Sequence, residues 1–205
     1  MSFAPDATEI LARARADLRM GVPVVLSGGN SAIVLAAETL DNQRLADLRA
    51  LGGQPVLAVT SRRAKTLKAR SYDGDLARII LPPDATLPWI LGVADPADDL
   101  KTPMKGPLIS QRDGSADLHR LALQLVKSAR LLPAAIILPL SDAFAFAAEN
   151  SLTFIDIARA KPLLSASPHP HPVVSARLPV EASEAGRLHI YRPEDGGEEH
   201  YAFEI

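Results

Sequence analysis

The sequence contains no cysteine among its 205 residues. This absence excludes disulfides, thiolate nucleophiles and every zinc or iron–sulfur site that uses cysteine ligands. An excess of positive charge is also missing, because 22 lysines and arginines stand against 24 aspartates and glutamates, a formal net charge of −2. This balance gives no electrostatic case for binding nucleic acid or an anionic membrane. We therefore expect a small-molecule or protein partner.

Long apolar runs are missing as well. No stretch approaches the roughly 20 apolar residues of a transmembrane helix, and the first residues lack the basic segment and apolar run of a signal peptide. We therefore expect a cytoplasmic protein. Hydrophobic residues make up 47% of the chain and charged residues 22%, which is typical of a globular domain with a sizeable core.

The first half of the chain carries both helix and strand patterns. Asp6 and Glu9 have capping-box spacing, which predicts a helix that ends at Gly21. Two β-type runs, 22–26 and 32–36, flank a Gly-Gly-Asn turn and predict a hairpin. The other elements predicted here are a helix over 42–51, a strand over 55–60, a short basic helix capped by Ser61, strands over 76–81 and 89–94, and a loop over 99–107.

The second half continues the same mixture up to about residue 160. The predicted elements are a long helix over 113–130, a buried strand over 134–140, a helix from a Ser141 cap to residue 150, and a short strand over 152–155. Mixed strands and helices with short links predict an α/β (α+β) domain, in which helices flank a partly antiparallel, mixed sheet.

The composition changes at Lys161. Four prolines among residues 162–172 predict an extended linker. Apolar residues then alternate with polar or small ones, which predicts a short C-terminal β segment that cannot bury its apolar face alone. This segment packs on the main domain, pairs with another copy, or continues outside the sequence. The expected division is a domain over 1–160, a linker over 161–175 and the first strands of a truncated second domain over 176–205.

Four segments of the first domain carry a family resemblance. They read DLRMGVPVVL (17–26), LAAE (35–38), PVLAVT (55–60) and LLPAAII (131–137). Together they resemble the 3,4-dihydroxy-2-butanone-4-phosphate synthases of riboflavin biosynthesis. The resemblance implies a homodimer with sites at the subunit interface, and a magnesium-dependent conversion of ribulose 5-phosphate to 3,4-dihydroxy-2-butanone 4-phosphate and formate.

The C-terminal segment carries a second, more specific resemblance. It reads ARLP (176–179), GRLHIY (186–191) and GEEHYA (197–202), which resembles the first strands of GTP cyclohydrolase II. Bacteria often fuse these two domains in this order. The cyclohydrolase resemblance implies a zinc ion held by three cysteines beyond the matched segment, so we expect no cofactor in this chain itself.

Three departures from the synthase pattern concern its chemistry. The family's acidic, magnesium-binding loop is replaced by SGGNS (27–31), which has no carboxylate. The nearest counterpart of a Gly-His-Thr-Glu segment is 113–119, where His119 is out of register. Leu138 and Pro139 stand where the family has a glutamate. We therefore assign no catalytic, cofactor-binding or metal-binding residue and expect an inactive synthase-like domain.

Four polar residues stay as weak candidates for residual chemistry: Glu38, Asp95, Asp117 and His119. The structural alternatives are a fold-determining role for Glu38, a turn former for Asp95, and a solvated or capping role for His119. Other motifs favour structural interpretations. Residues 27–31 favour a hairpin turn over a phosphate loop, and His169 and His171 favour a linker over a metal site. His189 and His200 favour cross-strand pairing, and the basic face of Arg62, Arg63, Lys65 and Lys68 favours a solvated surface over phosphate binding.

The leading hypothesis is an inactive N-terminal domain of a GTP cyclohydrolase II-type protein, which serves dimerisation or support of the cyclohydrolase. One alternative is an enzyme that keeps sugar-phosphate chemistry and magnesium through rearranged carboxylates such as Glu38, Asp95 and Asp117. The other is a regulatory module that binds a small phosphorylated ligand in the old pocket.

Overall fold

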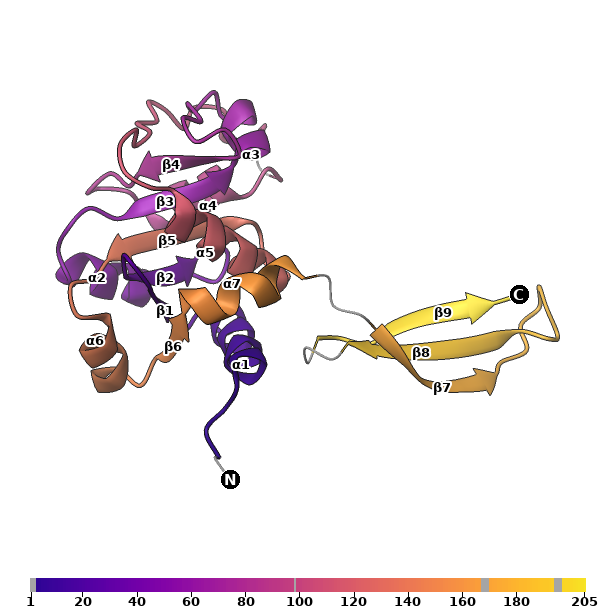
Figure 1. The fold of residues 1–205 in the computed structure, drawn as a ribbon. Helices are drawn as coiled ribbons and strands as arrows, with labels where there is room; N and C mark the ends of the chain where they lie inside the picture. Colours follow the sequence, from indigo (N-terminus) through magenta and orange to yellow (C-terminus); the bar gives the residue numbers. More distant parts are fainter. Residues whose placement is uncertain (1–2, 98, 167–169, 194–196) are drawn as a thin grey trace.

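The computed structural model describes residues 3–97, 99–166, 170–193 and 197–205. These residues form a six-stranded sheet covered by helices and a separate three-stranded sheet at the C-terminal end (Figure 1). The predicted α/β class, with a mixed sheet and a C-terminal β segment, is confirmed.

The elements follow one another along the chain with short connections. The helices are α1 (Ala7–Arg19), α2 (Asn42–Ala50), α3 (Ser61–Thr66), α4 (Leu87–Ala94), α5 (Asp117–Ser128), α6 (Ala143–Glu149) and α7 (Ile157–Ser165). The strands are β1 (Val24–Ser27), β2 (Ala32–Ala36), β3 (Val56–Thr60), β4 (Leu76–Ile80), β5 (Ala134–Pro139), β6 (Thr153–Asp156), β7 (Pro170–Arg177), β8 (Arg187–Pro193) and β9 (His200–Glu204).

The six-stranded sheet has the order β4-β3-β5-β2-β1-β6. The predicted hairpin is present, since β1 and β2 pair antiparallel with Val24 opposite Val34. The pairs β2–β5, β5–β3 and β3–β4 are also antiparallel, whereas β1 and β6 run parallel with Ser27 opposite Asp156. The sheet is therefore mixed, and the ends of β1 and β6 meet at one edge.

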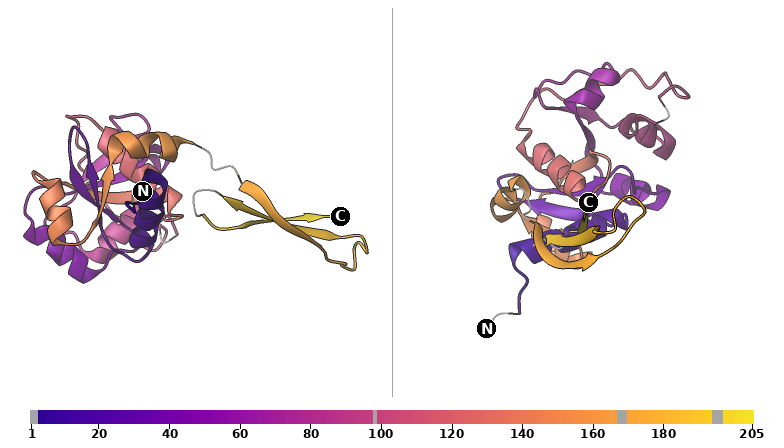
Figure 2. Two further views of the ribbon diagram at one scale, coloured as in Figure 1. Left: turned by 60° about the horizontal axis from the view of Figure 1, so that its bottom comes forward. Right: turned by 90° about the vertical axis from the view of Figure 1, so that its right-hand side faces the viewer.

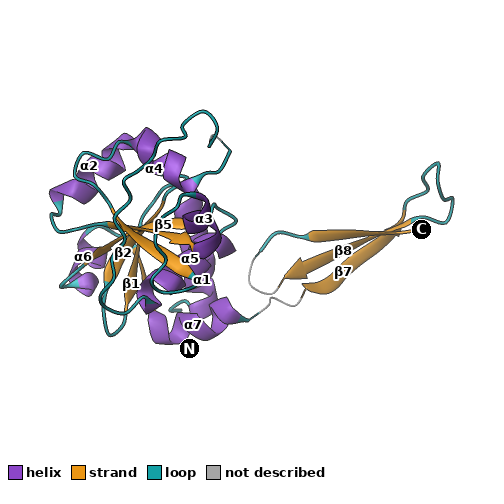
Figure 3. Ribbon diagram, turned by 90° about the horizontal axis from the view of Figure 1, so that it is seen from above, coloured by secondary structure: helices purple, strands orange, loops and turns teal. Residues whose placement is uncertain are grey.

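Helices cover both faces of this sheet (Figure 3). Alternate residues of β2 divide between the two sides: Val34 packs in a cluster with α1, α5 and α7, while Ile33 and Leu35 pack in a cluster with α2 and α4. Because successive strand side chains point to opposite faces, a strand buried on both sides is apolar throughout, as the sequence AIVLA of β2 is.

The start and end of α1 agree with the sequence pattern. The carboxylate of Asp6 accepts from the Glu9 amide at 2.8 Å, and the Asp6 amide donates to the Glu9 carboxylate at 2.8 Å, which completes the capping box. Gly21 has φ +75° just beyond the helix, the left-handed conformation that glycine adopts without steric cost.

The strand predicted over 89–94 is wrong, because these residues belong to α4. The Thr86 hydroxyl accepts from the Trp89 amide at 3.3 Å and caps the helix, and Pro88 lies in its first turn, where a missing N–H costs nothing. Ile90 and Val93 are buried on one side. A short apolar run is compatible with either a strand or a buried helix, and here the cap decides.

Other boundaries also differ. The helix predicted over 113–130 begins only at Asp117, after Gly114 at φ +81°. The caps are Thr60 and Asp142 rather than Ser61 and Ser141.

Much of the expected linker is regular structure, because α7 reaches Ser165 with Pro162 inside it and β7 begins at Pro170. His171 lies in β7, and His169 falls outside the described residues.

The second sheet has the order β7-β8-β9, with both pairs antiparallel. Its register places Val174, Ile190 and Tyr201 in one row and Ala176, Leu188 and Phe203 in the next, so one face is apolar. An ion pair between Arg130, just after α5, and Glu198 joins this sheet to the main body, and Figure 2 shows the two parts from two further directions. None of the helices in the described ranges has the length and apolar content needed to cross a membrane.

Candidate functional site

A cavity of about 420 Å³ lies where the β1–β2 turn, the start of α5 and the start of α7 come together. The parallel pairing of β1 with β6 explains this position, because the turn after Ser27 and the helix after Asp156 leave the sheet at the same edge. Polar side chains of the lining are Asn30, Ser115, Asp117, Arg120, Gln124 and Lys161, and apolar ones are Leu118, Leu121 and Ile157. A concave site with a few convergent polar groups is a natural candidate for a ligand site.

The turn 27–31 forms one wall of the cavity and has no charged side chain. The Ser31 hydroxyl donates to the Ser27 hydroxyl at 3.3 Å. A Cβ added to Gly28 would lie 3.0 Å from Cδ1 of Ile157, so this glycine allows the turn to pack closely on α7. The segment is the hairpin turn that the sequence predicted, and it packs on a helix that the sequence did not predict.

Asp117 is the carboxylate among the lining residues, and it is already engaged. It accepts from the Ser115 hydroxyl at 2.9 Å and from Nη1 of Arg120 at 2.9 Å. Arg120 in turn donates to both carboxylate oxygens of Asp75, at 2.6 and 2.9 Å. These hydrogen bonds hold the pKa of the Asp75 carboxyl below its usual value. Asp75, Arg120 and Asp117 are thus joined in one network of ion pairs along the polar wall.

His119 is not among the residues that line this cavity. Its Nδ1 is buried and makes no hydrogen bond to the described residues. Burial, with the nearby charge of Arg78, lowers the pKa of His119 from 6.5 to about 4. The histidine is therefore neutral at pH 7; it lies half-buried within α5 and does not line the cavity.

Glu38 and Asp95 lie far from Asp117 in the fold. Glu38 follows β2 and therefore lies at the opposite edge of the sheet from the hairpin turn, where it accepts from the Leu132 amide at 2.5 Å. Asp95 ends α4, on the other face of the sheet from α5, and caps the Ala97 amide at 2.8 Å. The fold does not bring the three candidate carboxylates together.

The described residues do not form a metal centre. Nowhere among them do three or more His, Cys, Asp or Glu side chains gather closely enough to hold an ion. Magnesium needs several carboxylate or water oxygens, and the lining offers the single carboxylate of Asp117. The side chains of this cavity therefore do not fit a resident magnesium ion.

Two relevant residues are not among the candidates that the sequence predicted. Lys161 lines the cavity from α7 but had been assigned to the linker, although Ile157, Ala160 and Leu164 have helical spacing after Asp156. Arg78 is the one charged residue inside the apolar strand β4, and this was the available signal. It holds segment 112–114, which leads into the cavity wall.

Comparisons with known proteins agree with both resemblances. No family model matches the chain. A protein named GTP cyclohydrolase-2 from Azospirillum brasilense is 32% identical over 203 residues, which cover 93% of this chain and 51% of that protein. The chain thus spans about half the length of this relative.

Solved structures give the fold. A two-domain 3,4-dihydroxy-2-butanone 4-phosphate synthase from A. baumannii superposes with a TM-score of 0.56 and 15% identity, covering 94% of this chain and 69% of that one. The synthase of Candida albicans gives a TM-score of 0.54 and 16% identity, covering 75% of this chain and 96% of that one. The chain therefore has the fold of the 3,4-dihydroxy-2-butanone 4-phosphate synthases and is similar in sequence to a GTP cyclohydrolase-2, as its motifs predicted.

Proposed function

We propose that this chain is the synthase-like N-terminal part of a GTP cyclohydrolase II-type protein of riboflavin biosynthesis, and that this part does not perform the synthase reaction. Its role is to dimerise the protein and to support the attached cyclohydrolase in the cytoplasm. The proposal draws on the synthase fold and on the sequence similarity to a GTP cyclohydrolase-2.

The observation that carries the proposal is the chemistry of the cavity. Enolisation of a sugar phosphate needs a base close to the abstracted proton, and magnesium needs carboxylate ligands. Asp117 is the lining carboxylate, and Ser115 and Arg120 both donate to it. Glu38 and Asp95 lie elsewhere in the fold, so rearranged carboxylates do not restore the missing set.

The C-terminal sheet supports the link to a cyclohydrolase. Its apolar face leaves Val174, Tyr201 and Phe203 at 54%, 63% and 38% exposure. A three-stranded sheet needs a packing partner over such a face, and further cyclohydrolase residues would provide one. The zinc ligands that this resemblance implies are cysteines, and the chain has none, so a zinc site of that kind would use residues outside this sequence.

A formate-release assay with ribulose 5-phosphate and Mg²⁺ tests the proposal. We expect no turnover above background, with an active synthase as the positive control. The matched variant is Asp117→Asn, which removes the charge of the carboxylate and keeps its shape. Magnesium-dependent formate release that this variant abolishes would establish the residual enzyme instead.

A regulatory site for a small phosphorylated ligand is the second candidate, and Lys161 favours it. This residue lines the cavity together with Asn30 and Gln124, and within the described residues it makes no ion pair. A ligand at about 100 times its Kd stabilises the folded state by about 2.7 kcal/mol. Thermal shift with ribulose 5-phosphate or inorganic phosphate should therefore raise the Tm of the wild type but not of Lys161→Gln, with Lys127→Gln as control.

A further inference from the structure

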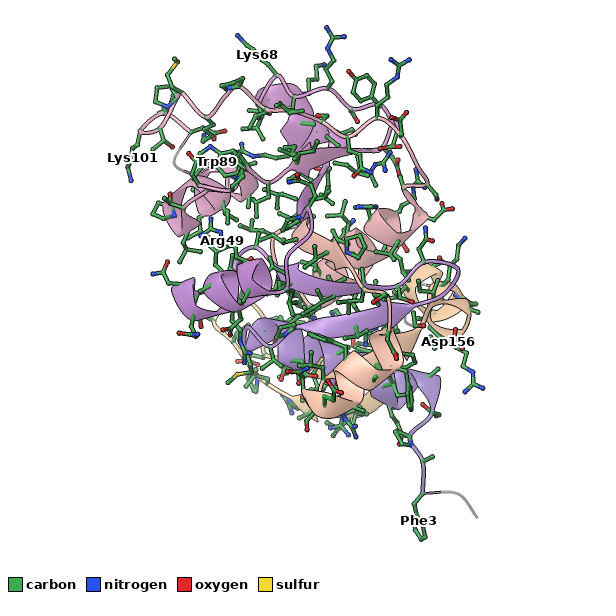
Figure 4. All side chains as sticks on the ribbon, turned by 90° about the vertical axis from the view of Figure 1, so that its left-hand side faces the viewer. Phe3, Arg49, Lys68, Trp89, Lys101 and Asp156 are labelled. Atoms are coloured by element: carbon green, nitrogen blue, oxygen red, sulfur yellow. The ribbon has the colours of Figure 1, made fainter. Side chains whose placement is uncertain are left out.

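A second polar surface lies away from the cavity, on α3 and the residues that follow it. The segment 61–70 reads SRRAKTLKAR, with five basic residues and no acidic one. Arg63 is buried, whereas Arg62, Lys65, Lys68 and Arg70 are exposed. Figure 4 shows Lys68 projecting from the end of the molecule that carries α3. We call these four side chains, together with Arg112 and Tyr72, the basic patch.

The positive charge of the patch is not neutralised by its neighbours. Within the described residues, Arg62, Lys65, Lys68 and Arg70 make no ion pair. The two acidic residues on either side of Gly74 form ion pairs with other arginines. Asp73 accepts two hydrogen bonds from Arg78, and Asp75 accepts two from Arg120. Asp113, beside Arg112, is the remaining nearby carboxylate in the sequence. The patch is therefore strongly positive in a chain whose net charge is −2.

Lys68 occupies a position that would suit glycine better. Its φ is +58°, directly after α3, in the left-handed region. A side chain there costs about 1–2 kcal/mol relative to the right-handed conformation, and glycine is the usual residue at this place after a helix. The chain thus carries a lysine at a position where glycine would make the folded state more stable.

An exposed aromatic ring lies within the patch. Tyr72 is 50% exposed, and the guanidinium carbon of Arg112 lies 5.9 Å from its ring centroid. The six residues of α3 extend over only about 9 Å, and Tyr72 follows the helix by six residues, so the cations of 62–70 and the ring come from one short segment of chain. Cations interleaved with an exposed ring suit a polyanion that carries planar groups, because phosphates meet the cations and bases stack on the ring.

We propose that the basic patch binds single-stranded RNA without sequence preference, through phosphate contacts of its five cations and base stacking on Tyr72. An extended polymer suits the patch better than a small ligand, since its side chains project from the surface and do not line the cavity beside α5. The expectation of no nucleic-acid partner rested on net charge, which does not describe this local surface. Lysine-rich surface is also less typical of protein–protein interfaces, where lysine is depleted.

Fluorescence anisotropy of the full chain with a labelled twelve-nucleotide oligouridine tests the proposal. The logarithm of the affinity should fall with the logarithm of salt concentration with a slope of about −3 to −4, since each neutralised phosphate of a single strand contributes about −0.7. Arg62→Gln with Lys65→Gln should weaken binding at least tenfold at low salt and reduce the slope by about 1.4. Tyr72→Leu should weaken binding while leaving the slope unchanged.

Two controls separate binding from folding and from net charge. Arg13→Gln with Arg19→Gln removes two exposed cations of α1 and should leave RNA binding within twofold of wild type. Lys68→Gly should raise the Tm and still weaken binding, an outcome that a misfolded variant cannot give. No binding at 50 mM salt, equal losses in the α1 and α3 variants, or displacement of RNA by an equimolar polyglutamate peptide, which would indicate an acidic protein partner, would each overturn the proposal.

Discussion

Arg78 and Asp73 form a two-point ion pair beneath the loop that leads into the cavity. Nε of Arg78 donates to Oδ2 of Asp73 at 2.8 Å, and Nη2 donates to Oδ1 at 3.0 Å. The remaining donors of Arg78 reach the carbonyl oxygens of Asp113 and Gly114 at 3.0 and 3.1 Å. Arg78 is 1% exposed, so its charge depends on these partners. The pair therefore fixes the segment that delivers Ser115 to the cavity wall.

Removing Asp73 should destabilise the fold strongly. Asp73→Ala leaves the Arg78 guanidinium buried without its counter-charge, and breaking such a pair costs about 3–5 kcal/mol. The free energy of unfolding, measured with urea, should fall by about that amount. The double variant Asp73→Ala with Arg78→Met should lose less than Asp73→Ala alone, because no unpaired charge remains.

The exposed Glu181→Ala provides the control and should change stability by less than about 0.5 kcal/mol. If Asp73→Ala behaved like this control, the ion pair would contribute little and the loop would be fixed by other contacts.

Sequence patterns predicted most helices and strands of the main domain, because capping residues and strand periodicity are local signals. Asp6 with Glu9 started α1 correctly, and the run AIVLA of β2 was recognised as a strand. The failure at Trp89 has a physical cause: a six-residue apolar run has no distinctive period, and only the Thr86 cap distinguished α4 from a strand.

The candidate site was harder to predict than the fold. The loss of carboxylates at 27–31 was visible in the sequence, but the second wall of the cavity was not. The prolines at 162 and beyond led to the prediction of a linker where α7 lies. The helix nevertheless has a cap, since Asp156 accepts from the Ala158 amide at 2.8 Å. Lys161 could be assigned to the cavity only once β6 was known to run parallel to β1, and strand pairing is a long-range property.

His119 predicts a pH dependence of stability in the mildly acidic range. Its pKa is about 4 in the folded state, below the ordinary 6.5, so the unfolded chain binds the proton first as pH falls. The contribution of the neutral His119 to the free energy of unfolding is therefore complete above pH 6.5. It is lost between pH 6.5 and 4, by at most about 3 kcal/mol. Urea unfolding of wild type and His119→Gln across this range measures it.

In the His119→Gln variant the loss over this window should shrink, and in NMR spectra of the wild type the ring signals of His119 should titrate near pH 4. If the ring of His119 itself titrated near pH 6.5 in the folded protein, the burial of His119 would be contradicted.

Asp99 predicts a second loss of stability at lower pH. Hydrogen bonds from Arg63, at 2.5 and 2.8 Å, and then from Lys105 hold the pKa of the Asp99 carboxyl far below its usual value. For a carboxyl with a lowered pKa, the stabilisation is present above the ordinary value near 4 and is lost as pH falls below it. The network also includes bonds from Arg63 to the carbonyl oxygens of Gly92, Val93 and Asp95, so residues 99–107, which carry Asp99 and Lys105, should loosen first.

Limited proteolysis at pH 3 and pH 7 measures this loosening. The wild type should be cleaved in loop 99–107 much faster at pH 3, whereas Asp99→Asn should be cleaved fast at both pH values because its amide cannot form ion pairs with the two cations. Equal protection of this loop at both pH values in the wild type would argue against a role for the ion pairs.

Gly21 predicts a steric effect where the end of α1 meets the segment after β2. A Cβ at this position would lie 2.7 Å from the carbonyl oxygen of Thr39, whose hydroxyl donates to the Leu18 carbonyl at 2.7 Å. Gly21→Ala therefore adds a backbone clash to the cost of a left-handed side chain, and the sum should reach about 2–4 kcal/mol. Urea unfolding at pH 7 measures the loss.

Gly74→Ala is the matched control, because its φ of +82° is similar but nothing lies within 4 Å of the added Cβ. It should cost only the conformational strain of about 1–2 kcal/mol. The difference between the two variants isolates the contact with Thr39, so equal losses would mean that the segment after β2 yields and does not hold the end of α1. A larger loss for Gly21→Ala would show that the close packing of Gly21 on Thr39 helps to hold α1 against the chain leaving β2, at the opposite edge of the sheet from the cavity.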